Sequence, residues 1–295
     1  MAPRRLTAPS LLVVLIAVGL LAGPATASSV GVPRLIFPVI GPTTYIDDFG
    51  APRGSSTHQA TDIMAAKKSA AVAAEAGTVK FWTTSSRAGC MLYLYGTSGT
   101  TYLYVHLNND RTMANDNTGA CVPGIAYARG LKSGSRVKAG QMVGYVGDSG
   151  DANGIAAHLH FEVHPNDGAA IDPYPYLQKA QKLLFAPQPG ADVFSLKLSG
   201  TVVDAEESSA TVAVKQLVRF PGQLTVPKVN RKVELAVSPE TAVFDPLGAL
   251  IAGARIAALV AGKAATVWTQ LQRPTLDAQL GVPFSLTAER IALTR

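Results

Sequence analysis

Residues 158–163 read His-Leu-His-Phe-Glu-Val, a strict alternation of polar and apolar side chains. Successive side chains of a β-strand point to opposite faces, so this pattern predicts a strand with one buried apolar face. His158, His160 and Glu162 then share the other face. Imidazole nitrogens and carboxylate oxygens are the ligands that zinc takes at catalytic sites, where three protein ligands leave a position for water. The segment therefore predicts a β-sheet and, on it, a candidate metal site.

Short alternating runs continue around this segment. Residues 91–95 and 101–107 flank a Gly-Thr-Ser-Gly turn and predict a β-hairpin. Residues 137–146 carry two glycines at turn or close-approach positions. The alanine-rich residues 65–76 favour a helix by local propensity, but a strand-like Gly-Thr-Val follows, so a helix and strands are both open there from the residues alone. The first half of the chain is therefore predicted to be mostly β, built on an antiparallel sheet.

The composition changes after a Pro-Gln-Pro-Gly stretch at 187–190, which a short helical piece at 178–185 is expected to precede. Residues 193–295 contain neither His nor Cys, and this region shows no acid/base or metal constellation. Its strand-like segments lie at 194–203, 210–220, 232–237, 254–260, 264–270 and 284–293. Six short strands separated by turns predict a small β-barrel, of which the OB type is one form. A binding or spacing role is expected for it.

The first 27 residues have the features of a secretory signal peptide. Arg4 and Arg5 precede an unbroken apolar stretch at 11–22, and Ala-Thr-Ala at 25–27 provides a small-residue cleavage site before Ser28. A membrane anchor is the alternative, but this apolar stretch is shorter than the roughly 20 residues that cross a bilayer. We therefore expect a secreted or cell-envelope protein with no stable membrane span after cleavage.

Export bears on the cysteines and on the charge. Cys90 and Cys121 predict a disulfide in an oxidising compartment, the alternative being two buried thiols. Loss of Arg4 and Arg5 would lower the formal charge from +6 to +4, which suits an anionic cell wall. Since no Lys/Arg cluster with interleaved aromatic residues is present, nucleic acid is not an expected partner. An apolar content of 47% with 16% charged residues excludes a disordered chain.

A second group of candidate ligands lies far upstream, where His58 and Asp62 are four residues apart. That spacing alone is weak, and a surface histidine beside a solvated aspartate is the alternative. From the residues alone, both His158 and His160 could be ligands, and His106 could be a core histidine. The chain has only five histidines. Their combination, in an exported protein without a helical H-E-x-x-H motif, favours a metal-dependent hydrolase.

Taken together, these segments resemble the lysostaphin/LytM-type zinc endopeptidases, which cut the peptide part of peptidoglycan and have the duplicated hybrid motif fold. The matching segments keep the family's order and lie at residues 37–39, 48–53, 58–63, 104–107, 137–144, 158–162 and 172–177. The resemblance implies a LytM-like zinc peptidase domain at 28–178, in which residues 65–76 form the family's pair of strands rather than a helix. The signal peptide at 1–27 and the β-barrel of unknown role at 193–295 lie outside the resemblance, and a linker is predicted at 179–192.

By position, the resemblance implies that His58, Asp62 and His160 bind Zn²⁺ and that His106 and His158 are catalytic. It implies hydrolysis of peptide cross-links through a metal-activated water, with peptidoglycan stems or cross-bridges as the partner. The alternative is a non-catalytic cell-wall-binding or hydrolase-activating protein on the same domain; a mainly adhesive role of the barrel is a third hypothesis. Which bond is cut, what the barrel binds and the oligomeric state are not given by the sequence.

The chain departs from the family pattern beside these positions, although every ligand position is kept. Ala60 stands where the family prefers glycine, and residues 154–157 replace its usual turn before the H-L-H. These departures affect the loops that line the groove. Glu162 is expected either to orient a histidine or to be solvated, and His164 is expected in a loop.

Overall fold

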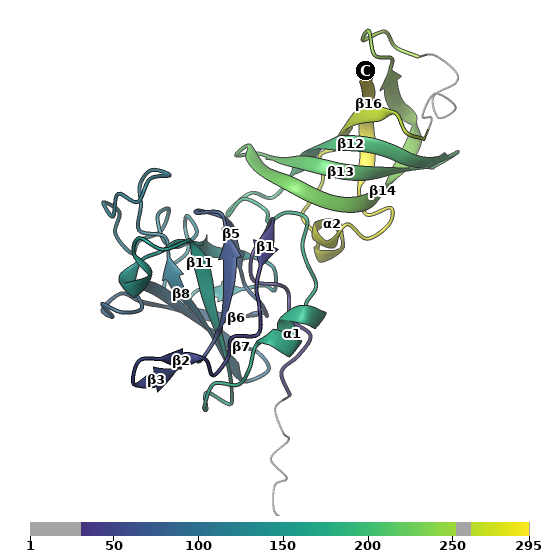
Figure 1. Ribbon diagram of the computed structural model, residues 1–295. Coiled ribbons are helices and arrows are strands. Elements are labelled where there is room, and N and C mark those ends of the chain that lie inside the picture. The colour runs from purple at the N-terminus through teal and green to yellow at the C-terminus, as the bar shows by residue number, and fades with distance from the viewer. Residues whose placement is uncertain (1–30, 252–260, 295) are drawn as a thin grey trace, which may run out of the picture.

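The structure, a computed structural model, describes residues 31–251 and 261–294. The predicted signal peptide and the strand predicted at 254–260 lie outside the described residues. Two β-rich modules lie side by side, with the first in purple to teal and the second in green to yellow (Figure 1). The mostly β fold class is confirmed. Within the described part of the chain, no helix has the length and apolarity needed to cross a membrane.

The first module is built on a seven-stranded sheet in which every neighbouring pair is antiparallel. In spatial order its strands are β1 (Thr43–Thr44), β4 (Thr61–Ala65), β11 (His158–Pro165), β8 (Thr100–Leu107), β7 (Cys90–Gly96), β6 (Gly77–Trp82) and β9 (Arg136–Val137). Two small sheets accompany it, β5 (Ala70–Val72) with β10 (Met142–Tyr145) and β2 (Pro52–Arg53) with β3 (Ser56–Thr57). The predicted hairpin is confirmed as β7 and β8.

The alternating pattern of β8 and β11 places their apolar side chains in the core. Tyr104 and Phe161 are fully buried and pack edge to face, with ring centroids 5.3 Å apart. The alanine-rich segment 65–76 contains the last residue of β4 and the whole of β5 and no helix, in line with the expected strands. Residues 70–74 are all buried, because small side chains fit the narrow space between β5 and the N-terminal segment, where Val72 N–H donates to the Pro38 carbonyl.

The disulfide between Cys90 and Cys121 is present, with Cα atoms 5.1 Å apart. It joins the start of β7 to the middle of the long segment between β8 and β9. A short 3₁₀-helix η1 (Gly150–Ala152) lies between β10 and β11, and the helix α1 (Tyr174–Lys179) follows β11.

The second module is a closed barrel with strand order β12-β13-β14-β16-β15. Its strands are β12 (Ser195–Glu206), β13 (Ser209–Phe220), β14 (Leu224–Phe244), β15 (Ala264–Thr269) and β16 (Thr287–Thr294), and β14 pairs with β16 in parallel. The strand predicted at 232–237 is the middle of the 21-residue β14. The helix α2 (Leu276–Leu280) is capped by the Thr275 hydroxyl and ended by Gly281 at φ 67°. The OB type stays a prediction.

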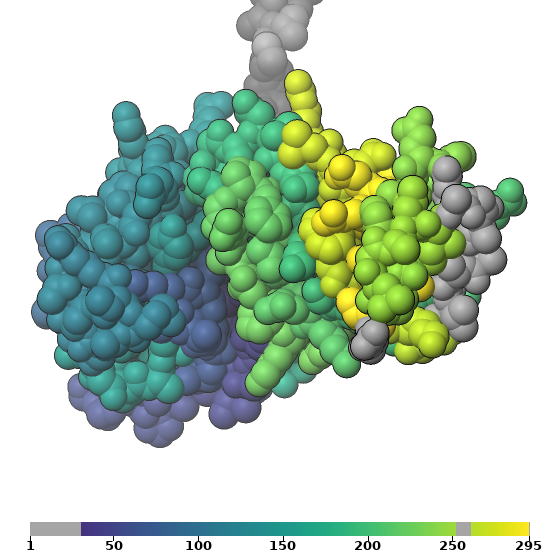
Figure 2. Space-filling model, turned by 90° about the horizontal axis from the view of Figure 1, so that it is seen from above, coloured from purple at the N-terminus to yellow at the C-terminus, as the bar shows by residue number. Residues whose placement is uncertain are grey.

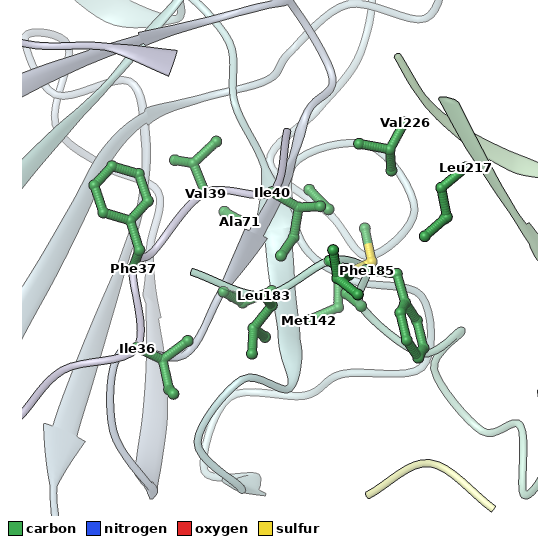
Figure 3. Close-up of a cluster of buried hydrophobic side chains, with 14 of the residues drawn as sticks. Ile36, Phe37, Val39, Ile40, Ala71, Met142, Leu183, Phe185, Leu217 and Val226 are labelled. Carbon is green, nitrogen blue, oxygen red and sulfur yellow. The ribbon is translucent and has the colours of Figure 1, made fainter. Parts of the chain in front are cut away.

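The expected helix at 178–185 is wrong beyond Lys179, where α1 ends. Residues 183–186 are instead buried between the modules, because their side chains complete a hydrophobic cluster that both modules share. In Figure 3, Phe185 lies between Met142 of the first module and Leu217 of the barrel, and Leu183 lies beside Met142 on the side away from the barrel. Figure 2 shows the barrel strands in direct contact with the first module. The boundary at 179–192 stays a prediction.

Polar contacts also join the two modules. The Gln279 side chain in α2 donates to the Gly140 carbonyl at 3.3 Å. Arg231 of β14 donates to the Lys182 carbonyl at 2.8 Å and to the Leu280 carbonyl at 2.7 Å. The barrel is therefore held against the peptide segment that enters it as well as against the first module.

Candidate metal centre

Three predicted ligands converge on one point of the sheet. Asp62 and His160 are direct cross-strand partners in β4 and β11, and the buried His58 directly follows β3, three residues before β4. His58 Nε2 lies 3.0 Å from His160 Nδ1 and 3.1 Å from Asp62 Oδ1. His160 Nδ1 lies 3.1 Å from the same Asp62 oxygen. These three atoms form a nearly equilateral triangle.

This triangle fits a divalent cation. Two imidazole nitrogens and one carboxylate oxygen form the donor set, and bonds of about 2.0–2.2 Å to such atoms are those of zinc. Ligand atoms about 3 Å apart can all reach one ion at that distance. His158, the other histidine of the H-L-H pair, lies outside the triangle; its Nε2 is 3.9 Å from Asp62 Oδ1.

His58 and Asp62 each also contact a polar group outside the triangle. His58 Nδ1 lies 3.0 Å from the Asp48 carbonyl oxygen, so Nδ1 carries the hydrogen and Nε2 offers its lone pair to the triangle. The Arg53 guanidinium donates to Asp62 Oδ2 at 3.1 Å, which leaves Oδ1 facing the histidines. The sequence offered a signal for Asp48 and Arg53, because both lie in the segment 48–53 that carries the resemblance, but no role was assigned to them.

The third ligand also has an outer partner. Glu162 Oε1 lies 3.1 Å from His160 Nε2, so the Glu162 carboxylate contacts a ligand histidine. His164 lies in β11 rather than in a loop, and its Nε2 is 2.6 Å from Glu162 Oε2. The expectation for His164 was wrong because β11 continues through Pro165, two residues beyond the alternating segment.

Because the ligand atoms lie close together, the ligand residues shift one another's pKa values. Burial alone would raise the pKa of Asp62, but the hydrogen bond from His160 and the nearby His58 hold it well below its usual range. Burial would lower the pKa of His160, yet Asp62 and Glu162 together raise it to about 9. In the metal-free protein, a proton on His160 therefore supplies the positive charge that a cation would bring.

His106 and His158 lie next to the triangle, and a backbone carbonyl orients each of the two rings. His106 Nδ1 is 2.8 Å from the Ser149 carbonyl, and His158 Nδ1 is 2.9 Å from the Ala156 carbonyl. Since a carbonyl only accepts, both rings carry their hydrogen on Nδ1 when neutral, and Nε2 is free to accept a proton. Their ring centroids are 5.1 Å apart.

His106 is under two further constraints. It adopts a left-handed backbone conformation at φ 59°, which is rare for a non-glycine residue and frequent at functional sites. Burial, as the largest cause, lowers the pKa of His106 to about 4. His106 is not a core histidine, which was the alternative, because its side chain lines the cleft.

All five predicted site residues line one cleft of about 550 Å³. The cleft is also lined by Arg87 and Asp151, whose side chains form an ion pair at 3.4 Å, and by the exposed Ile155. Asp151 Oδ1 lies 3.7 Å from His106 Nε2. No sequence motif pointed to Arg87, which lies in the loop between β6 and β7, or to Asp151, which lies in η1.

Part of the chain is similar to a known peptidase family. Residues 125–173 match the model of peptidase family M23. The match includes His158 and His160, whereas His58, Asp62 and His106 lie before it. The chain thus resembles the M23 peptidases, and the resemblance to the lysostaphin/LytM type is confirmed.

Solved structures of similar proteins include catalytic domains of this class. The lysostaphin catalytic domain from Staphylococcus simulans is 24% identical, over 46% of this chain and 92% of its own, with a TM-score of 0.35. The catalytic domain of the prophage-encoded M23 protein EnpA from Enterococcus faecalis is 24% identical, over 46% of this chain and 94% of its own, with a TM-score of 0.34. A zinc-containing peptidase from Vibrio cholerae is 19% identical, over 53% of this chain and 41% of its own, with a TM-score of 0.35.

Proposed function

We propose that this protein is a secreted zinc-dependent endopeptidase that hydrolyses peptide cross-links of peptidoglycan. The observation that carries the proposal is the triangle of His58 Nε2, Asp62 Oδ1 and His160 Nδ1 at 3.0–3.1 Å, in one cleft with two further histidines. The family match supports the peptidase class. We propose the binding of zinc, the cleavage of peptide cross-links and the roles of the individual site residues together.

In the proposed mechanism, the three triangle atoms hold Zn²⁺. A bound zinc ion supplies a Lewis acid that polarises the peptide carbonyl and makes water nucleophilic at neutral pH. Asp48 and Arg53 keep His58 and Asp62 turned toward the ion through their contacts at 3.0 Å and 3.1 Å.

His106 and His158 handle protons and charge. With Nδ1–H donated to a backbone carbonyl, each ring presents Nε2 to the cleft. One Nε2 accepts the proton of the attacking water, and the other, once protonated, donates a hydrogen bond to the oxygen on which negative charge develops. Burial keeps His106 neutral near pH 7, so its Nε2 lone pair is available to accept that proton.

The test is digestion of purified peptidoglycan by the mature protein with and without a chelator, followed by mass analysis of the products. Released peptides whose appearance stops with chelation and returns with added zinc would support the proposal. Release that ignores chelation would reject the zinc mechanism, and release of sugar fragments alone would reject the peptidase assignment. No release at all would favour the non-catalytic wall-binding or hydrolase-activating alternative.

Export is proposed from the sequence of residues 1–27 and is tested separately. Expression in a bacterial host with an oxidising envelope, followed by intact-mass analysis, should give a mature chain that begins at Ser28. A chain that keeps Arg4 and Arg5 would contradict cleavage.

A further inference from the structure

Glu162 is a carboxylate beside the candidate metal centre that is not one of its ligands. Its Oε1 lies 3.1 Å from Nε2 of His160, and its Oε2 lies 2.6 Å from Nε2 of His164. The side chain is 15% exposed, so water competes little for either oxygen. Residues 160, 162 and 164 alternate along β11, and this places all three side chains on one face of the sheet.

The far end of this chain of contacts is fixed to the backbone. His164 Nδ1 lies 2.8 Å from the Gly168 carbonyl oxygen. Gly168 closes a tight turn directly after β11, in which its N–H donates to the Pro165 carbonyl at 3.0 Å. The turn therefore gives His164 an anchor that does not depend on a mobile side chain.

The hydrogen-bond directions follow from the partners. Carboxylate and carbonyl oxygens only accept, so His160 donates Nε2–H to Glu162, and His164 donates both of its ring N–H groups, to Glu162 and to Gly168. His164 is then an imidazolium whose charge balances that of Glu162. With Nε2 of His160 occupied in this way, the ring presents Nδ1 to His58 and Asp62.

We propose that Glu162 and His164 are positioning residues of the metal centre: Glu162 locks the His160 ring with Nδ1 toward the other ligands, and His164 locks Glu162. The inference rests on the proposed function, since it assumes that the triangle binds zinc. Outer partners of metal-ligating histidines fix the ring orientation and raise ligand basicity, and their loss typically costs 10–100-fold in metal affinity.

The experiment measures zinc affinity of the metal-free mature protein by competition with a chromophoric chelator. Glu162→Ala should raise the zinc Kd by about 10–100-fold. Glu162→Gln should rescue much of that loss, because the amide oxygen still accepts from His160 Nε2–H. His164→Ala should raise Kd by less than Glu162→Ala, and adding it to Glu162→Ala should change nothing further, since His164 acts only through Glu162.

Asp167→Asn is the matched control. It removes a negative charge close to His164 without touching the chain of contacts, and its Kd should equal that of the wild type. Visible absorption of the Co²⁺-loaded proteins gives a second readout, in which Glu162→Ala should shift the ligand-field bands and Asp167→Asn should not.

The outcomes separate the two proposals. A wild-type protein that does not bind zinc overturns the proposed function. Zinc binding by the wild type with an unchanged Kd in a folded Glu162→Ala variant overturns the role of Glu162 alone. A His164→Ala effect that is absent, or that persists in the Glu162→Ala background, overturns the role of His164. Thermal unfolding of the metal-free variants checks folding. If Glu162→Ala does not fold, Glu162→Leu replaces it, because leucine keeps the bulk of the side chain but offers no acceptor to His160 Nε2–H.

Discussion

The backbone carbonyl of Ser149 lies 2.8 Å from Nδ1 of His106 and fixes the tautomer of that ring. Ser149 is itself held in place by its hydroxyl, which accepts from the Cys90 N–H at 2.9 Å and donates to the Leu107 carbonyl. Strands β7 and β8 thus set the position of a residue in the segment between β10 and β11, and through it the orientation of a cleft histidine.

Replacing Ser149 with alanine should therefore weaken both the fold and the site. The change leaves a buried N–H and a buried carbonyl without their partner, at a cost of about 1–3 kcal/mol for such groups. Urea unfolding should show that loss, and peptide release should fall because His106 is less firmly held. Ser208→Ala, at an exposed turn, is the control and should match the wild type in both measurements.

His106 should make the folded state less stable in acid. Its pKa of about 4 in the folded protein lies below the ordinary value of 6.5, so the unfolded chain binds the proton more tightly. The stability is fully present above pH 6.5 and is lost as the pH falls toward 4. Between pH 7 and 4.5 the loss amounts to about 2–3 kcal/mol.

Comparison with His106→Gln isolates this contribution, because other histidines titrate in both proteins. Urea unfolding of the metal-free proteins at pH 7 and 4.5 should give a smaller difference for the variant. Equal differences would mean that His106 is protonated as easily in the folded as in the unfolded state.

Zinc binding should release a proton. In the metal-free protein Asp62 and Glu162 hold the pKa of His160 at about 9, so Nδ1 carries a hydrogen at pH 7 that a metal must displace. Calorimetric titration in buffers of different ionisation enthalpy should report about one proton per zinc at pH 7, and fewer above pH 9. A binding enthalpy that does not depend on the buffer would contradict this.

The sequence predicted the site better than its surroundings. His158, His160 and Glu162 could be placed on one face because strand alternation is strict, and the resemblance in motif order brought in His58, Asp62 and His106. The contacts of Asp151 and Ser149 with His106 could not be predicted, because both residues lie in the segment between β10 and β11, whose path is set by tertiary packing. The helix expected at 178–185 failed for a related reason: local propensity does not reveal that residues 183–186 are buried on two sides.

Removing the disulfide should cost a measurable share of stability. Cys90 and Cys121 close a loop with a sequence separation of 31 residues, for which chain entropy gives about 3–4 kcal/mol. The double variant Cys90→Ala/Cys121→Ala should show that decrease in urea unfolding. Reductant should destabilise the wild type by a similar amount and leave the double variant unchanged.

The first module should lose stability without the barrel. A chain ending at residue 192 would expose Leu183, Phe185 and Met142, which are buried in the shared cluster. Its thermal midpoint should lie below that of the full chain, and it should bind a hydrophobic dye. A truncated module that melts at the temperature of the full chain and binds no dye would show that the two cores are independent.

The shared cluster around residues 183–186 also constrains how such a protein can diversify. A different barrel would need its own counterparts to Leu217 and Val226, which pack in the shared cluster, and to Arg231, which binds the Lys182 carbonyl. The two modules therefore cannot be exchanged independently of each other. A chimera should keep the segment 181–192 together with the barrel that packs against it.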